Sequence, residues 1–166
     1  MQKLFTIIIL LLLSYVPIEC LALSSDKTQP VFVESDWATL NHKTGISTYH
    51  GHVKLTQGTT VVTADNLVTY TDKHNQLLKA VATGQLASYS TLPDNSKLLF
   101  TAVALTINYY PPKGYTEFIG QAKAIQGNDT YAGPQINYDI NLQIVTSPKS
   151  QQGRTSIVIL PSQKEQ

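Results

Sequence analysis

The sequence predicts an all-β fold built from stacked antiparallel strands, and three observations lead to this prediction. Residues that favour strands, above all Thr, Val, Ile and Tyr, are abundant, while charged residues make up only 14% of the chain. Turn-forming residues recur at the short intervals that are typical of all-β proteins. After residue 22, no long window shows apolar residues at helical spacing without an intervening Gly or Pro.

A repeated strand organises this part of the chain. The sequence GHVKLTQG at residues 51–58 returns as GQAKAIQG at 120–127, and more weakly as GQLASY at 84–89. In the first copy, Val53 and Leu55 fall on one face and Lys54 on the other, so we expect a strand with a glycine at each end. A strand cannot bury its apolar face alone, and a recurring strand therefore predicts stacked units that share one core.

A second repeat alternates with the first. It has the form small-x-x-apolar, and its four copies are residues 35–40, 64–69, 104–109 and 133–138. Asp36 and Asp65 occupy the same position in two copies, while Leu105 and Pro134 replace them in the others. We therefore interpret the two acids as features of the repeat and not as an acidic site. The alternation of the two repeats predicts a stack of antiparallel hairpins.

The remaining elements follow in chain order. We expect the first strand at 31–35, a second at 36–40 and the last at 155–160, with turns at 41–45, 72–76, 93–96, 111–114, 127–129, 139–141 and 148–153. Only Pro30 precedes the first strand and only Pro161 follows the last, so neither edge is strongly protected. Both ends of the stack are predicted to accept partner strands, through Val31, Phe32 and Val33 at one end and Ile157, Val158 and Ile159 at the other.

Residues 1–22 read as a signal peptide. Lys3 precedes an apolar run, Leu4 to Val16, that is shorter than the roughly 20 residues needed to span a bilayer. Cys20 and Ala22 fit a small-x-small cleavage site, and Glu19 argues against lipidation of Cys20. We expect one domain at 23–166 with an ordered core of about 29–162; a retained anchor helix is the alternative. Cys20 is the only cysteine, so no disulfide is expected.

Several function classes find little support. The 12 Lys and Arg residues nearly balance the 11 Asp and Glu residues, and Arg154 is the only arginine, so no nucleic-acid partner is expected. His50 and His52 are spaced to share a strand face, with His42 and His74 in turns, but no third ligand stands at a fixed spacing. No paired carboxylates, nucleophile elbow or phosphate-binding loop is present. We expect no metal, no cofactor and no catalytic residue.

The inward faces are the remaining candidates for function. Strand alternation places a mostly mid-sized apolar set inside, which would form either a filled sandwich core or an open groove for an apolar ligand. This set is Val31, Val33, Val53, Leu55, Leu67, Tyr89, Ile107, Tyr109, Phe118, Ala122, Ala124, Ile136 and Tyr138.

The order and spacing of these motifs resemble the OstA-like family of periplasmic lipopolysaccharide-export proteins. The similarity is carried by residues 33–36 after Pro30, the strand 51–58, the unit 64–67, the segment 120–122 and the terminal 158–163, and it extends from about 29 to 163. One departure is Leu86, where family members often carry Pro.

The resemblance implies a single twisted, V-shaped β-jellyroll that is open at both ends. Such proteins bind the lipid A acyl chains of lipopolysaccharide in the interior groove, associate head to tail, and join an inner-membrane anchor protein to an outer-membrane translocon. The resemblance also implies that the Val31 end faces the inner-membrane partner. The alternatives are a membrane-anchored partner protein of the same pathway, a β-fold enzyme or binding module acting on envelope polysaccharide, and a scaffold with a filled core.

Overall fold

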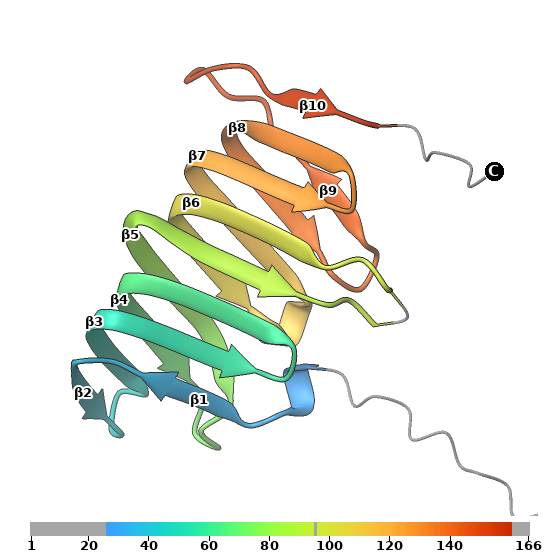
Figure 1. The fold of residues 1–166 in the computed structure, drawn as a ribbon. Helices are drawn as coiled ribbons and strands as arrows, with labels where there is room; N and C mark the ends of the chain where they lie inside the picture. The colour runs from blue at the N-terminus through green and yellow to red at the C-terminus, as the bar shows by residue number, and fades with distance from the viewer. Residues whose placement is uncertain (1–25, 95, 161–166) are drawn as a thin grey trace, which may run out of the picture.

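The fold is one antiparallel β-sheet that bends back on itself, seen in a computed structural model that describes residues 26–94 and 96–160 (Figure 1). The expected signal peptide lies outside the described residues. Within them, no helix is long and apolar enough to cross a membrane. The all-β, antiparallel prediction is confirmed.

The described residues form ten strands and two short 3₁₀ helices. In chain order these are η1 (Asp26–Thr28), β1 (Val31–Glu34), β2 (Trp37–Asn41), β3 (Ile46–Gln57), β4 (Thr60–Thr71), β5 (Leu77–Thr91), β6 (Phe100–Tyr110), η2 (Pro111–Lys113), β7 (Tyr115–Gln126), β8 (Asp129–Asp139), β9 (Ile144–Thr146) and β10 (Ser156–Val158).

The strands stack in the order β1-β3-β4-β5-β6-β7-β8-β10. At one end, β1 and β2 pair with opposite halves of β3; at the other, β10 and β9 pair with opposite halves of β8. At each end of the stack, two short strands therefore take the place of one long strand. In the part of the chain that the structure describes, both ends of the stack are free sheet edges, as the sequence predicts.

A line of β-bulges runs across the middle of the stack, and we call it the crease. The pairing shifts between His50 and Val53 in β3, and again at the same level in β4 to β8. The expectation that Gly51, Gly84 and Gly120 begin strands is therefore wrong: each lies in the middle of a longer strand. In β3 and β7 the extra residue needs a positive φ, which is +75° at Gly51 and +79° at Gly120.

The two sequence repeats meet at the crease. The first glycine of each copy of the first repeat lies against the second residue of the preceding small-x-x-apolar unit: Asp36 against Gly51, Asp65 against Gly84 and Leu105 against Gly120. The carboxylate of Asp65 also accepts a hydrogen bond from the backbone N–H of Gln85 at 3.2 Å. The acids therefore support the bulged backbone, which explains why they recur in the repeat.

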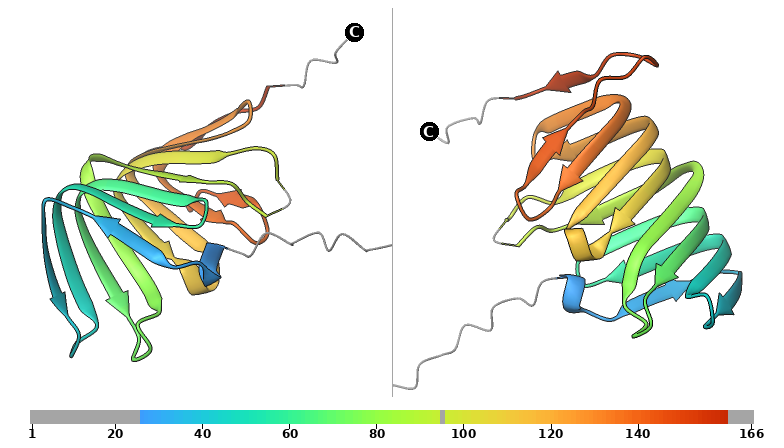
Figure 2. Two further views of the ribbon diagram at one scale, coloured as in Figure 1. Left: turned by 60° about the horizontal axis from the view of Figure 1, so that its bottom comes forward. Right: turned by 180° about the vertical axis from the view of Figure 1, so that it is seen from behind.

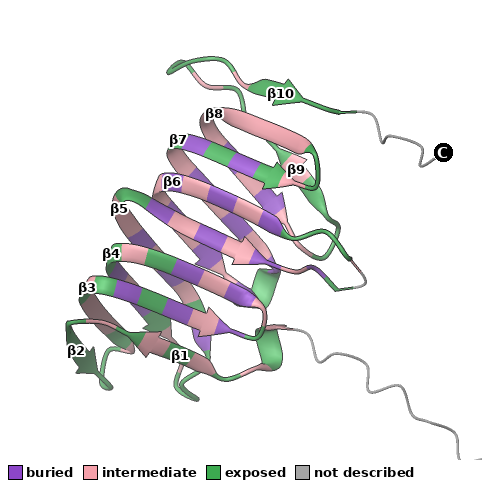
Figure 3. Ribbon diagram, in the orientation of Figure 1, coloured by how far each residue is buried: buried purple, intermediate pink, exposed green. Residues whose placement is uncertain are grey.

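The crease divides the sheet into two arms that face each other in a V (Figure 2). The β1/β10 arm contains β1, β10 and the strand halves that pair with them, and the β2/β9 arm contains β2, β9 and the other halves. Both arms carry buried residues (Figure 3), and these form one apolar core cluster.

The strand boundaries differ from expectation at the two edges. Asp36 lies at the crease between β1 and β2, because Ser35 and Asp36 interrupt the pairing with β3. The last strand is shorter than expected and ends at Val158, so Ile159 follows the paired residues.

Candidate functional site

The predicted inward set lies in the interior of the V. Eleven of its residues are buried in the core, and Val31 and Val33 are partly buried and pack against it. The buried members are Val53, Leu55, Leu67, Tyr89, Ile107, Tyr109, Phe118, Ala122, Ala124, Ile136 and Tyr138. Contact of these residues with a lipid stays a prediction.

An aromatic cluster joins the two arms across the interior. Phe100 from the β1/β10 arm stacks on Tyr138 from the β2/β9 arm with ring centroids 3.8 Å apart. Tyr89, also of the β1/β10 arm, lies 5.4 Å from Phe118 and 5.9 Å from Tyr109 of the other arm. All five rings are at most 5% exposed. These rings therefore fill the middle of the interior and hold the arms together.

Sequence reasoning missed Phe100 because the crease reverses the alternation within β6. Phe100, Ala102 and Ala104 face inward before the bulge, and Ile107 and Tyr109 face inward after it. A strict two-residue period counted back from Tyr109 points Phe100 outward. Only the glycine repeat, interpreted as a row of bulges, could have shown the change of phase.

The interior also contains polar atoms. The hydroxyls of Tyr89 and Tyr138 are buried and make no hydrogen bond of ordinary geometry within residues 26–94 and 96–160, although threonine side chains lie near Tyr89 and Gln126 lies near Tyr138. Burial raises the pKa of Tyr89 and of Tyr138, so both phenols stay protonated. The Tyr109 hydroxyl donates to Oε1 of Gln57 at 3.1 Å, which links the two arms through a buried hydrogen bond.

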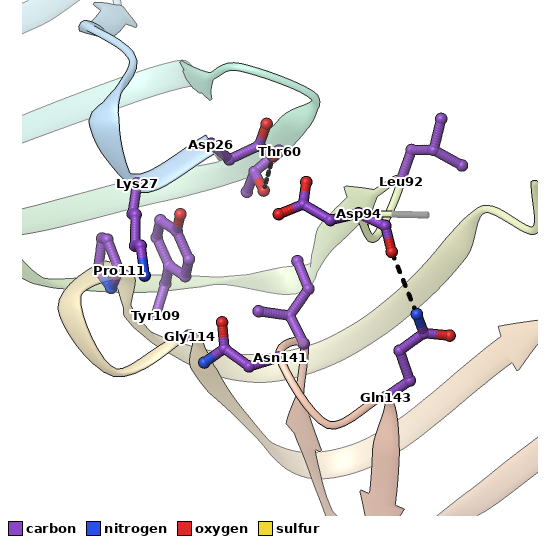
Figure 4. Close-up of a pocket in the computed structure, with 11 residues that line it drawn as sticks. Asp26, Lys27, Thr60, Leu92, Asp94, Tyr109, Pro111, Gly114, Asn141 and Gln143 are labelled. Atoms are coloured by element: carbon purple, nitrogen blue, oxygen red, sulfur yellow. Dashed lines mark hydrogen bonds between the residues drawn. The ribbon is translucent and has the colours of Figure 1, made fainter. Parts of the chain in front are cut away.

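The ends of the two arms meet around a pocket of about 350 Å³, which we call the mouth (Figure 4). It lies on the side of the V opposite the crease, and both arms and the segment before β1 contribute to it. Its lining residues are Asp26, Lys27, Thr60, Leu92, Asp94, Tyr109, Pro111, Gly114, Ile140, Asn141 and Gln143.

One side of the mouth is closed by the segment Asp26–Gln29, which we call the clasp. The Asp26 carboxylate accepts hydrogen bonds from the backbone N–H and the hydroxyl of Thr59, at 2.8 and 2.7 Å, and from the hydroxyl of Thr60 at 2.8 Å. Nε2 of Gln57 donates to the carbonyls of Lys27 and Gln29. The clasp is therefore fixed to the end of the β1/β10 arm, while η1 touches η2 of the other arm.

The other side of the mouth is bridged by a long hydrogen bond between two loops. Nε2 of Gln143, in the turn between β8 and β9, donates to the backbone carbonyl of Asp94 at 3.3 Å (Figure 4). Exposed leucines lie on the same two loops: Leu98 and Leu99 follow Asp94, and Leu142 precedes Gln143.

His50 and His52 lie at the crease, while His42 and His74 lie in separate turns. Nδ1 of His50 is 2.6 Å from Oδ1 of Asn66, and Nδ1 of His52 is 2.7 Å from Oδ2 of Asp36. The bulge at Gly51 interrupts the alternation that would have placed both imidazoles on one face. Hydrogen bonding to Asp36 raises the pKa of His52. Among the described residues, no three His, Cys, Asp or Glu side chains are grouped as a metal would need.

The two sheet edges expose apolar side chains. Phe32 is 63% exposed on β1, and Trp37 and Leu40 are exposed on β2. Ile157 and Val158 on β10 are also exposed, as is Ile159 beyond it. Each edge therefore combines unpaired backbone groups with apolar surface.

Comparison with known proteins identifies the family of this chain. Residues 32–144 match the family described as "LptA/(LptD N-terminal domain) LPS transport protein". The chain belongs to this family. A curated member, the lipopolysaccharide export system protein LptH of Pseudomonas aeruginosa, is 35% identical over 153 residues, covering 88% of this chain and 87% of LptH. The lipopolysaccharide export system protein LptA of Escherichia coli K12 is 27% identical over 147 residues, covering 88% and 79%.

The fold agrees with that of a solved family member. The crystal structure of Pseudomonas aeruginosa LptH, described as the LptA-homologous periplasmic component of the lipopolysaccharide transport device, superposes with a TM-score of 0.76 at 33% identity. The superposition covers 82% of this chain and 99% of that one. The resemblance drawn from the sequence motifs is confirmed.

Proposed function

We propose that this protein carries lipopolysaccharide across the periplasm, with the acyl chains of lipid A held in the interior of the V. The observation that supports this most directly is a continuous apolar interior that runs through a stack with two unpaired edges. Each methylene hidden from water is worth about 0.8 kcal/mol, so a lipid with several chains needs a continuous apolar path to move through water. The names of LptH and LptA as export proteins support the same function.

The sheet edges are the proposed partner sites. Backbone groups of β1 and β10 are free to pair with strands of other jellyrolls by β-augmentation. We propose that the Val31 edge meets an inner-membrane anchor protein, that the Ile157 edge meets an outer-membrane translocon, and that copies also join head to tail. The interior of one unit would then continue into the next. The protein acts without a cofactor and is a carrier, not an enzyme.

Photo-crosslinking tests the location of the lipid. A photoreactive amino acid at buried Phe118 or Tyr109 is expected to capture lipopolysaccharide, while one at Lys123, exposed on β7, is not. Comparable capture at all three positions would contradict an interior lipid site.

Mass measurement tests the proposed periplasmic location. A cleaved signal peptide predicts that the native protein lacks residues 1–22 and that residues 23–166 form the mature domain. A native mass that includes residues 1–22 would favour a membrane-anchored partner of the same pathway.

A further inference from the structure

We propose that the mouth is a lateral gate and that the clasp Asp26–Gln29 holds it shut, so that lipid acyl chains occupy the interior only when the two arms part along this side. The proposal rests on the function proposed above and adds where the interior opens and what keeps it closed.

The chemistry of the ligand requires an opening along the length of the stack. The acyl chains of lipopolysaccharide are covalently attached to a sugar headgroup that is too polar for an apolar core. While the chains lie inside, the headgroup must project into water. A chain that enters through one end therefore still needs a slot beside it through which the headgroup passes.

The mouth is where such a slot can form. On the crease side, the ladders from β3 to β8 continue on both sides of each bulge, and parting them would break backbone hydrogen bonds. At the mouth the two arms meet through turns and side chains, among them the Gln143–Asp94 contact at 3.3 Å. Opening there costs no sheet hydrogen bond.

The clasp is connected to the interior by a chain of hydrogen bonds. Gln57 donates to the clasp carbonyls and accepts from the hydroxyl of Tyr109 on the opposite arm. Tyr109 in turn lies against Tyr89 in the aromatic cluster. Release of the clasp would free Gln57, and with it one of the contacts that hold the arms together.

Opening of the mouth would also let buried tyrosine hydroxyls form hydrogen bonds to the lipid. Among the described residues, the buried hydroxyls of Tyr89 and Tyr138 make no hydrogen bond of ordinary geometry, although Thr60, Thr91 and Thr116 lie near Tyr89 and Gln126 lies near Tyr138. The first carbons of lipid A acyl chains carry ester or amide carbonyls that accept hydrogen bonds. Parting of the arms would therefore give these donors better-placed acceptors than the closed state offers.

A reversible crosslink across the mouth tests the gate. Asp94→Cys and Gln143→Cys in the secreted protein would be joined by a short bis-maleimide whose spacer contains a disulfide, and binding of fluorescent lipopolysaccharide would be measured. We expect at least a tenfold loss of affinity on crosslinking and full recovery when a reductant cleaves the spacer. The matched control joins Thr63→Cys and Ser88→Cys, neighbours on one arm, and should leave binding unchanged.

The outcomes separate the two proposals. If the Asp94/Gln143 variant binds lipopolysaccharide equally well before and after crosslinking, the gate is wrong and the carrier function stands. If neither this variant nor the unmodified protein binds lipopolysaccharide, the carrier function itself is wrong.

A second variant tests the clasp alone. Asp26→Asn keeps the shape of the side chain but removes the charge that strengthens its hydrogen bonds to Thr59 and Thr60. We expect lipopolysaccharide to associate several-fold faster, in stopped-flow fluorescence, with a circular dichroism spectrum like that of the unmodified protein. Glu34→Gln, which removes an exposed carboxylate from β1, is the control. An unchanged or slower association rate for Asp26→Asn would overturn the role of the clasp.

Discussion

At the scale of single residues, the crease depends on glycines that have no room for a side chain. Gly51 combines a φ of +75° with a position directly against the Asp36 carboxylate, so an added Cβ would overlap that group. Gly84 lies at the same level of β5 without a positive φ, and its Cβ would approach Asp65 Oδ2 to 3.0 Å. Gly51 therefore combines backbone strain with severe crowding, whereas Gly84 has only the milder crowding.

We predict that Gly51→Ala lowers the free energy of unfolding by about 1–3 kcal/mol, because the left-handed backbone conformation is unfavourable for alanine and its Cβ displaces Asp36. Gly84→Ala should cost less, since only the crowding applies. Urea denaturation of both variants measures the difference. An equal loss for the two would show that the positive φ contributes nothing to stability.

The Asp36–His52 pair gives the crease a pH dependence. Hydrogen bonding and charge attraction from Asp36 raise the pKa of His52 above its usual value of 6.5. A raised folded-state pKa means that the pair stabilises the fold fully below pH 6.5 and that this contribution is lost as pH rises through the folded-state value.

An NMR titration measures this shift directly. We predict that the His52 imidazole titrates above 6.5 in the unmodified protein and that Asp36→Asn moves the midpoint downward. His52→Gln identifies the resonance. An Asp36→Asn midpoint equal to that of the unmodified protein would exclude Asp36 as the cause.

At the scale of strands and turns, the sequence was sufficient for some features and not for others. The all-β class, the stacking of repeats and the inward positions near Val53 and Leu55 could be predicted, because two-residue alternation is unbroken within each half-strand. The mid-strand bulges could not be read from alternation alone, and they reverse the phase that decides whether Phe100 faces inward. The clasp was missed because Asp26 lies in a polar segment whose partners, such as Thr59, are distant in sequence.

The edge strands should be the least protected elements. All five residues of β2 are exposed and pair on one side only, whereas β5 lies between two neighbours. We predict that backbone amides of β2 and β10 exchange with deuterium on the order of 100-fold faster than those of β5 in dilute monomer. If protection from exchange grows with protein concentration at the β1 and β10 edges, and not in β5, this would support head-to-tail pairing. Edge amides that exchange as slowly as those of β5 in the monomer would contradict the free edges.

At the scale of the whole molecule, the two arms of the V are joined in the interior by aromatic packing. The Phe100 ring takes part in this packing through Tyr89 of its own arm and through Phe118 and Tyr138 of the other. The same rings occupy the space that acyl chains would take. Stability of the empty protein and access to its interior are therefore opposed.

We predict that Phe100→Ala lowers the free energy of unfolding by about 3–5 kcal/mol and at the same time strengthens binding of a fluorescent apolar probe such as N-phenylnaphthylamine. The loss follows from removing a fully buried ring, and the tighter binding follows from the space left between the arms. Phe32→Ala is the matched control, since that ring is 63% exposed at the β1 edge and lies outside the core cluster, and it should change neither property appreciably. If Phe100→Ala is destabilised but binds the probe no better than the unmodified protein, the aromatic cluster stabilises the fold without limiting access to its interior.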